Sequence, residues 1–499
     1  MKRRIPNALP GVSRRQLLGA AGLLAMMPPP SSAADRLDQG PFEIEQDDGW
    51  MTIASANPSS QPVRNPGLGL VGYTWEESGP SIAARKGLET LEQHVDRLSR
   101  LPFVDVLYIR CDWKHVQSRP GALNMHPVWR LTLDAAKSRG LRVAFRVQLS
   151  NPNSPDGPIA MPDFVKAKVP LVKIGTDRAN GGSTELYEPR YDDPAFQAAF
   201  RDLNELLARQ FDGDPLIEWV DLMQYGFWGE GHTSNLHNPF PDFATAEKTF
   251  VEMTDLQLSA WKKTPLAVNT QPDISGVGNR KVIDMAMHAG AWLRSDSVIV
   301  EEPVQVDMLA NRPPWLAVVM EDGYDRRYEL SMRPRLERTL RHALELGANY
   351  WSLWTESANL EKFFGANPQL LQPLQSRIGY RVRPAWVWQR KRRGANELVM
   401  AVYNDGVAGV PGQLSVNVTT PDGRFRTSGT LDPGYPHAGR LRECAVTLPR
   451  ELEGQKVRIE AAIEVRPGVR KAVRWAIDAP EPYEVTLLRW DDPSWRKNV

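Results

Sequence analysis

Residues 129–147 have the sequence WRLTLDAAKSRGLRVAFRV, in which an amphipathic segment, a glycine and an apolar run follow one another directly. The spacing predicts a helix over 129–139 and a strand over 141–147, and Gly140 suits the left-handed position that ends a helix. The same order recurs at 335–354 and, more weakly, at 282–293. Repeated units of this kind are typical of folds in which strands and helices alternate.

The alternation extends from about 66 to 385, and eight βα units over about 320 residues fit a (β/α)8 TIM barrel. A doubly wound open sheet is the alternative, but the first strand is followed by neither a dinucleotide-binding glycine pattern nor a phosphate loop. The eight predicted strands are Leu68–Tyr73, Val104–Arg110, Val143–Gln148, Ile217–Gln224, Leu266–Thr270, Trp292–Ile299, Trp315–Met320 and Tyr350–Trp354.

After about 386 the pattern changes to short alternating segments separated by Asn-Asp-Gly, Pro-Asp-Gly and Pro-Gly turns. Such spacing predicts a β-sandwich of the immunoglobulin-like kind. The expected division is therefore a barrel over 35–385 and a sandwich over 386–499. The basic run 389–393, at the junction, is interpreted as a solvated linker. The predicted sandwich strands are Glu397–Asn404, Gln413–Val418, Arg442–Leu448, Val457–Val465, Lys471–Ile477 and Tyr483–Arg489.

The first 34 residues have the features of a targeting segment. Arg14 and Arg15 precede an apolar run, 17–27, and a Pro/Ser/Ala stretch that suits signal peptidase follows. This is the twin-arginine pattern, and the run is too short to span a membrane. We therefore expect export by the twin-arginine machinery to the periplasm or the exterior, with no membrane span in the mature protein.

Composition excludes several classes of protein. The 61 Lys and Arg residues nearly balance the 60 Asp and Glu residues, which argues against nucleic-acid binding. Cys111 and Cys444 are too far apart for a cysteine zinc site, and we expect them not to pair. No spacing specifies a metal or cofactor, although a structural calcium ion in Asp/Asn loops stays open. The 16 tryptophans suit stacking on sugar rings as well as core packing.

Two glutamates are the candidate catalytic pair. Glu230 follows the fourth predicted strand in a glycine- and aromatic-rich segment, and Glu321 follows the seventh. Strand ends at the carboxyl face of a barrel carry the catalytic groups, and hydrolysis of a glycosidic bond needs two carboxyl groups. If the strand count is wrong by one, Glu301 or Glu302 replaces Glu321. Glu356 is expected at the rim of the cleft.

Other strand ends are rich in amides, arginine and tryptophan, which suit an uncharged, polyhydroxylated ligand such as an oligo- or polysaccharide. The candidate substrate-binding residues are Arg110, Asp112, Trp113, Gln148, Gln224, Trp228, His232, Asn269, Trp351 and Trp354.

Several short motifs together resemble the clan A (β/α)8 glycoside hydrolases, including β-galactosidase-like members and a group of exported bacterial proteins with a C-terminal β domain. The motifs are Asn65–Gly69, Tyr108–Trp113 with Arg119–Asn124, Trp228–His232 and Trp351–Trp354. The resemblance implies a retaining glycosidase with Glu230 as acid/base and Glu321 as nucleophile. Gly229 departs from it, because many clan members have an asparagine there that binds a sugar hydroxyl. A non-catalytic carbohydrate-binding or cell-surface protein is therefore the alternative.

Overall fold

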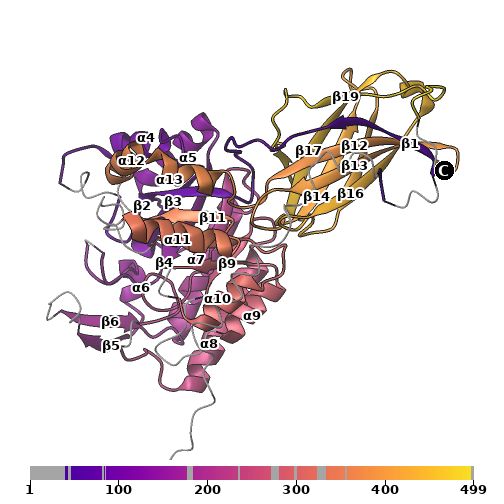
Figure 1. Cartoon of the computed structure of the whole chain (residues 1–499). Coiled ribbons are helices and arrows are strands. Elements are labelled where there is room, and N and C mark those ends of the chain that lie inside the picture. The colour runs from indigo at the N-terminus through magenta and orange to yellow at the C-terminus, as the bar shows by residue number, and fades with distance from the viewer. Residues whose placement is uncertain are drawn as a thin grey trace, which may run out of the picture.

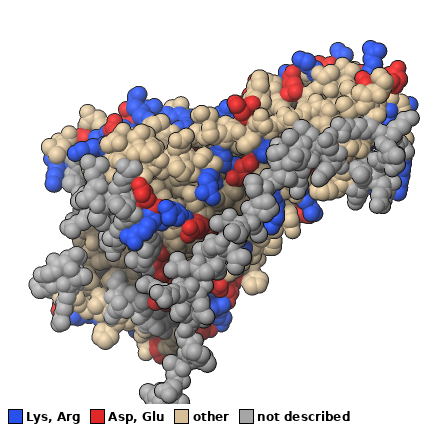
Figure 2. Space-filling view, in the orientation of Figure 1, with Lys and Arg blue, Asp and Glu red and all other residues tan. Residues whose placement is uncertain are grey.

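The computed structural model describes residues 40–42, 47–80, 84, 86–154, 156–176, 184–233, 236–270, 280–296, 301–322, 333–354 and 357–495. They form a barrel domain and an elongated β domain that extends from one side of it (Figure 1). Acidic and basic side chains are interspersed over the described part of the face in Figure 2, without one extended patch of a single sign.

Eight parallel strands close into a barrel in the order β10-β11-β2-β3-β4-β7-β8-β9, which confirms the predicted fold. Each predicted strand overlaps an observed one, and the fourth and sixth end earlier than expected. The strands are β2 (Gly69–Trp75), β3 (Val106–Asp112), β4 (Arg142–Gln148), β7 (Ile217–Asp221), β8 (Leu266–Asn269), β9 (Trp292–Ser295), β10 (Val318–Glu321) and β11 (Tyr350–Leu353).

Helices surround the barrel, and their apolar faces pack on the outer side of the strands (Figure 1). Gly140 ends α5 with φ 64°, as predicted, and Asp193 caps α7 ahead of Pro194. None of the helices in the described ranges is long and apolar enough to cross a membrane. The helices are α4 (Leu91–Ser99), α5 (Pro127–Arg139), α6 (Asp163–Lys166), α7 (Pro194–Phe211), α8 (Phe243–Ala260), α9 (Arg280–His288), α10 (Pro303–Ala310), α11 (Arg333–Glu345), α12 (Ser357–Ala366) and α13 (Pro368–Gln375).

A two-stranded hairpin, β5 (Leu171–Thr176) and β6 (Glu185–Pro189), is inserted between β4 and α7. Sequence analysis did not anticipate it. Ile174 and Leu186 of the hairpin pack against Phe227, which lies in the loop after β7. The insertion therefore lies beside the segment that carries Glu230.

The C-terminal domain is a sandwich of two antiparallel sheets around an apolar core, as predicted. One sheet contains β1 (Asp47–Ser55), β12 (Val382–Arg392), β13 (Ala395–Asn404) and β16 (Leu441–Leu448). The other contains β14 (Gln413–Thr419), β15 (Arg426–Leu431), β17 (Lys456–Arg466), β18 (Val469–Val473) and β19 (Glu484–Thr486). Cys444 is buried here and Cys111 is buried in the barrel, and both are free.

Two segments of the sandwich differ from expectation. The strand β1 pairs with β12, although the expected division placed residues 47–55 with the barrel. The basic run 389–393 is not a solvated linker, since its first four residues belong to β12. Arg390 is buried because Glu397, across the ladder on β13, accepts its hydrogen bonds at 2.7 and 2.9 Å.

A buried glutamate joins the two domains at the amino end of the barrel. Glu218 of β7 accepts hydrogen bonds from the Tyr350 hydroxyl at 2.6 Å and from Arg142 at 2.5 Å. Lys471 of β18 reaches the same carboxylate at 3.1 Å. The sandwich is therefore tied to the end of the barrel opposite the predicted active site.

Candidate active site

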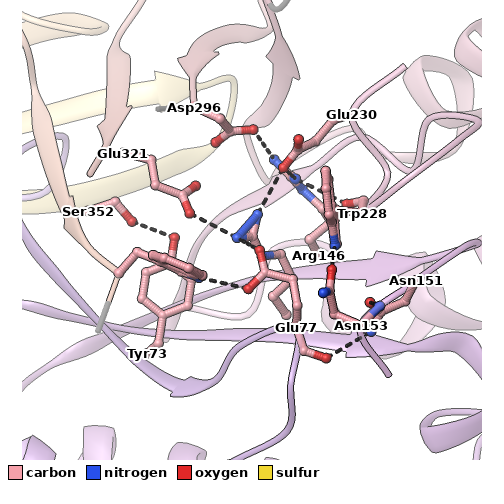
Figure 3. Close-up of polar contacts among 12 residues, drawn as sticks. Tyr73, Glu77, Arg146, Asn151, Asn153, Trp228, Glu230, Asp296, Glu321 and Ser352 are labelled. Carbon is pink, nitrogen blue, oxygen red and sulfur yellow. Dashed lines mark hydrogen bonds and ion pairs between the residues drawn. The ribbon is translucent and has the colours of Figure 1, made fainter. Parts of the chain in front are cut away.

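Charged side chains lie directly above the apolar interior of the barrel. The interior core includes Tyr108, Ala144, Trp219, Trp292 and Val319, one from each of five strands. Because side chains alternate along a strand, the residues two positions further also point inward, at the carboxyl end. These residues are Arg110, Arg146, Asp221, Arg294 and Glu321 (Figure 3 shows part of the cluster).

Arg110 connects the two predicted catalytic glutamates. Its Nη1 donates to Glu230 Oε1 at 3.0 Å, and its Nη2 donates to Glu321 Oε1 at 2.8 Å. Nη2 also donates to Glu77, which follows β2. Glu230 and Glu321 are only 5% and 3% exposed. The structure therefore brings the predicted pair into one buried site around one guanidinium.

Two further arginines and two aspartates complete the cluster. Arg146 Nη1 donates to Glu230 Oε1 at 3.1 Å, while Arg294 contacts Glu321 and donates from Nε to Asp296 at 2.9 Å. Both arginines lie 3.3 Å from Asp221. The cluster thus sets five carboxylates, Glu77, Asp221, Glu230, Asp296 and Glu321, around three guanidiniums. The negative charge exceeds the positive charge, which favours retention of a proton.

The pKa shifts indicate where that proton resides. Burial raises the pKa of Glu230, Asp296 adds to the effect, and His232, Arg146 and Arg110 oppose it. Burial also raises the pKa of Glu321 well above its ordinary value, against Arg110 and Arg294. Burial disfavours ionised Asp296 too, but Arg294 and Arg146 outweigh it and hold that pKa well below its usual range. Glu230 and Glu321 are therefore the protonatable pair, beside an ionised Asp296.

Several predicted substrate-binding residues surround this pair. His232 Nε2 lies 3.2 Å from Glu230 Oε2, and Asn269 bonds to Asp296. Trp354 is partly exposed and donates from its indole nitrogen to Glu77 at 2.7 Å. Trp228, also partly exposed, donates to Asn153 at 2.9 Å. The two indole rings are thus fixed by hydrogen bonds close to the cluster (Figure 3 labels Trp228 and Glu77).

Two buried glutamines, Gln148 at the end of β4 and Gln224 in the loop after β7, have amide groups without a partner among the described residues. Gln148 and Gln224 are buried, yet neither the oxygen nor the nitrogen of either amide forms a hydrogen bond with another described residue. Gln148 lies two positions beyond Arg146 and so faces the same interior. Asp112 is opposite it on β3 and accepts from Asn151 at 2.7 Å. Unpaired buried amides are costly, and a ligand rich in hydroxyls would satisfy them.

Other candidates do not join the cluster. Trp113 and Trp351 are fully buried in the core between strands and helices, where Trp113 donates to Gln117 at 2.8 Å. Glu301 contacts Ser295 and His342 instead of Arg110, and the backbone of Glu302 begins α10. The structure therefore pairs Glu230 with Glu321. Glu356 lies outside the described residues.

Sequence analysis missed five charged residues as site members: Glu77, Arg146, Asp221, Arg294 and Asp296. The signal that could have found most of them is periodicity. Arg146 and Arg294 each stand two positions after an interior apolar residue of their strand. An arginine buried in a strand requires a carboxylate nearby, because an unpaired buried charge is too costly.

Within the described ranges, no group of three or more His, Cys, Asp or Glu side chains is arranged to hold a metal ion. No protein-family model matches the sequence, and no curated protein matches it.

Solved structures do show similarity to the chain. Exo-β-1,4-mannosidase Op5Man5 from Opitutaceae bacterium strain TAV5 matches at 17% identity and TM-score 0.37, over 66% of this chain and 58% of its own. The chain thus spans just over half the length of that enzyme. Endo-glycoceramidase II from Rhodococcus sp. matches at 14% identity and TM-score 0.38, over 79% of this chain and 100% of its own. D-allulose 3-epimerase from Methylomonas sp. matches at 12% identity and TM-score 0.32, over 64% of this chain and 100% of its own. These likenesses concern the fold, and the reaction has to be argued from the site.

Proposed function

We propose that the protein is a retaining glycoside hydrolase, with Glu230 as acid/base and Glu321 as nucleophile. The observation that supports this most is the placement of both carboxyl groups on the two Nη atoms of Arg110, inside a buried site at the carboxyl end of the barrel. Two carboxyl groups about 5–5.5 Å apart suit a double displacement, whereas 6.5–9.5 Å leaves room for a water and suits inversion. Sharing one guanidinium favours the shorter separation.

In the proposed reaction, a Glu321 oxygen attacks the anomeric carbon while the bond from that carbon to the leaving oxygen breaks. Glu230 supplies the proton that the leaving oxygen needs, and a glycosyl ester on Glu321 results. A water then gives its proton to Glu230 and attacks the anomeric carbon, which releases the sugar and restores both carboxyl groups. The reaction requires a protonated Glu230 and an ionised Glu321. Burial raises the pKa of both carboxyl groups, and Arg110 and Arg294 are the groups that favour the ionised form of Glu321.

Recognition of the sugar would rest on the groups around the pair. The unpaired amides of Gln148 and Gln224 can each donate to one hydroxyl and accept from another. The partly exposed indoles of Trp228 and Trp354 offer apolar faces for stacking. Since carboxylates outnumber cations, a neutral sugar suits the site better than an acidic one.

The second candidate function is carbohydrate binding without turnover. Gly229 favours it, because the residue before Glu230 supplies no side chain to hold a sugar hydroxyl. The two functions differ in one measurable property, which is release of the leaving group.

Turnover of a panel of nitrophenyl glycosides tests the proposal. We expect the wild type to cleave at least one, and Glu321→Gln to lose activity on it by about 1,000-fold or more. Glu321→Ala should regain some turnover with azide, which fits the vacated space. Glu230→Ala should lose most activity on poor leaving groups and least on activated aryl ones. Wild-type rates in both alanine variants, on a substrate the wild type cleaves, would refute the assignment.

A further inference from the structure

The loop that carries Glu230 has a strained backbone. Gly226, Gly229 and Gly231 adopt φ values of 79°, 75° and 79°, and Trp228 adopts 56° although it is not a glycine. A Cβ at position 226 would lie 2.0 Å from the His232 carbonyl oxygen, so only glycine fits there. A tryptophan in this left-handed region is rare and costs free energy. Local backbone hydrogen bonds, such as that from the Phe227 N–H to the His232 carbonyl oxygen at 2.8 Å, and contacts from neighbouring segments together hold residues 226–231, called the acid turn below, in this conformation.

Two such contacts come from neighbouring segments. The Gly226 N–H donates to the Tyr191 hydroxyl at 2.9 Å, and the Trp228 N–H donates to the Ser150 carbonyl oxygen at 3.0 Å. Tyr191 lies between β6 and α7, and Ser150 follows β4. The acid turn is thus anchored at one residue on each side of Phe227.

One carboxylate supports both anchors. Glu188 of β6 is 0% exposed, and its Oε2 accepts a hydrogen bond from the Tyr191 hydroxyl at 2.5 Å. Its Oε1 accepts a hydrogen bond from the Ser150 hydroxyl. Neither the proposed mechanism nor the sequence motifs use this residue. Glu188 thus forms a hydrogen bond with each of the two residues that anchor the acid turn.

We propose that Glu188 is a positioning residue: its ionised carboxylate holds the acid turn through Tyr191 and Ser150, and its protonation loosens that hold. The inference rests on the proposed function only in that Glu230 is taken as the acid/base. The ionised form accepts from both hydroxyls at once. The protonated form presents an O–H to one of them, so that hydroxyl loses its acceptor.

The carboxyl group of Glu188 changes its protonation state near neutral pH. Burial raises the pKa of Glu188 to about 7, while Ser150, Tyr191 and His232 pull it the other way. Tyr191 and His232 are the titratable groups that influence it, and burial raises the pKa of Tyr191 far above neutrality, so that the phenol stays a donor. The acid turn is therefore held fully only well above pH 7, and the hold weakens as the pH falls through about 7.

The variant Glu188→Gln tests the proposal, because glutamine imitates the protonated carboxyl at every pH. We expect kcat to fall about fivefold at pH 8, the effect of one lost hydrogen bond on a rate. The ionisation near pH 7 should disappear from the kcat profile. Glu185→Gln, on the exposed face of the same strand, is the matched control and should keep the wild-type profile. A Glu188→Gln profile identical to that of the wild type would overturn the proposal.

A second readout does not depend on turnover. In full-length protein labelled with 5-fluorotryptophan, the ¹⁹F resonance of Trp228, assigned with Trp228→Phe, should titrate near pH 7 in the wild type and Glu185→Gln but not in Glu188→Gln. Tyr191→Phe removes a hydrogen bond that favours the carboxylate, so its titration should move to higher pH. No titration in the wild type, or none shifted by Tyr191→Phe, would overturn the inference. A normal titration without any glycoside turnover would instead refute the proposed function alone.

Discussion

Replacing Arg110 with methionine removes the guanidinium that Glu77, Glu230 and Glu321 share. Truncating one partner of a buried ion pair costs about 3–5 kcal/mol of unfolding free energy. The lower end applies here, because Arg146 still contacts Glu230 and Arg294 still contacts Glu321. The carboxylates can also relieve repulsion by taking up a proton, at about 1.4 kcal/mol per unit of pKa shift. We therefore expect Arg110→Met to lower the unfolding free energy by about 3 kcal/mol.

Catalysis should suffer more than stability alone explains. Without Arg110 the pKa values of both glutamates rise, so the nucleophile is neutral over more of the pH range and kcat/KM falls at least about 100-fold. Arg110→Lys keeps one charge but cannot place a nitrogen on both glutamates at once, and it should lose less stability yet remain impaired. Urea unfolding and initial rates on the best nitrophenyl glycoside measure both effects.

Arg142 provides the matched control. It is a buried arginine on β4 that also binds a glutamate, Glu218, but at the opposite end of the barrel. Arg142→Met should lose comparable stability while the folded fraction keeps the wild-type kcat/KM. If Arg110→Met is as stable as the wild type to within about 1 kcal/mol and as active, the cluster does not work as argued.

Three further predictions follow from individual contacts. His232 lowers the pKa of Glu230 through its hydrogen bond, so His232→Ala should raise that pKa and move the basic limb of the kcat/KM–pH profile to higher pH; a shift to lower pH would contradict this. Burial opposes ionisation of Glu218, but Arg142 and Lys471 outweigh burial and lower the pKa of Glu218 from 4.5 to about 2. As the pH falls from about 5 to 2, the wild type should therefore lose about 3 kcal/mol of unfolding free energy through this group, and Glu218→Gln should not show that loss. Urea unfolding at both pH values checks the difference. N-terminal sequencing of exported protein should begin near Ala34 or Asp35, and replacement of Arg14 and Arg15 by lysines should abolish export.

The barrel could be predicted from the sequence because its signals are local. Buried parallel strands are short apolar runs, and glycines such as Gly140 mark the helix ends between them. The strand β1 carries no comparable signal. Its place in the sandwich depends on pairing with β12, more than 300 residues later, and no local pattern specifies such a partner. The basic end of β12 was interpreted as a linker for a related reason. Glu397, which neutralises Arg390, lies on the next strand, and the basic run itself does not show this pairing.

The site could be predicted only in part. Glu230 and Glu321 follow from strand counting, whereas Glu77 and Asp296 become visible only through the arginines that they bind. Trp351 was placed in the site because it lies at a strand end, but alternation turns it outward while its neighbour Ser352 bonds to Tyr73 inside the barrel. The register of a short strand decides which of two neighbours faces the site, and the sequence alone left that register open.

Gly229 connects the departure from the clan pattern to the structure of the site. Its φ of 75° suits glycine, and a Cβ there would lie 3.4 Å from Arg146 Cδ and 3.9 Å from the Gln224 backbone nitrogen. Any side chain at this position would therefore extend toward the arginine that binds Glu230. A side chain at position 229 would thus be strained by the backbone conformation and would lie against Arg146. Under the proposed function, the amides of Gln148 and Gln224, which have no partner among the described residues, are the groups assigned to the neighbouring sugar hydroxyl. The proposed turnover is therefore compatible with the absence of asparagine, because other side-chain amides near the cluster have hydrogen-bonding atoms without a described partner.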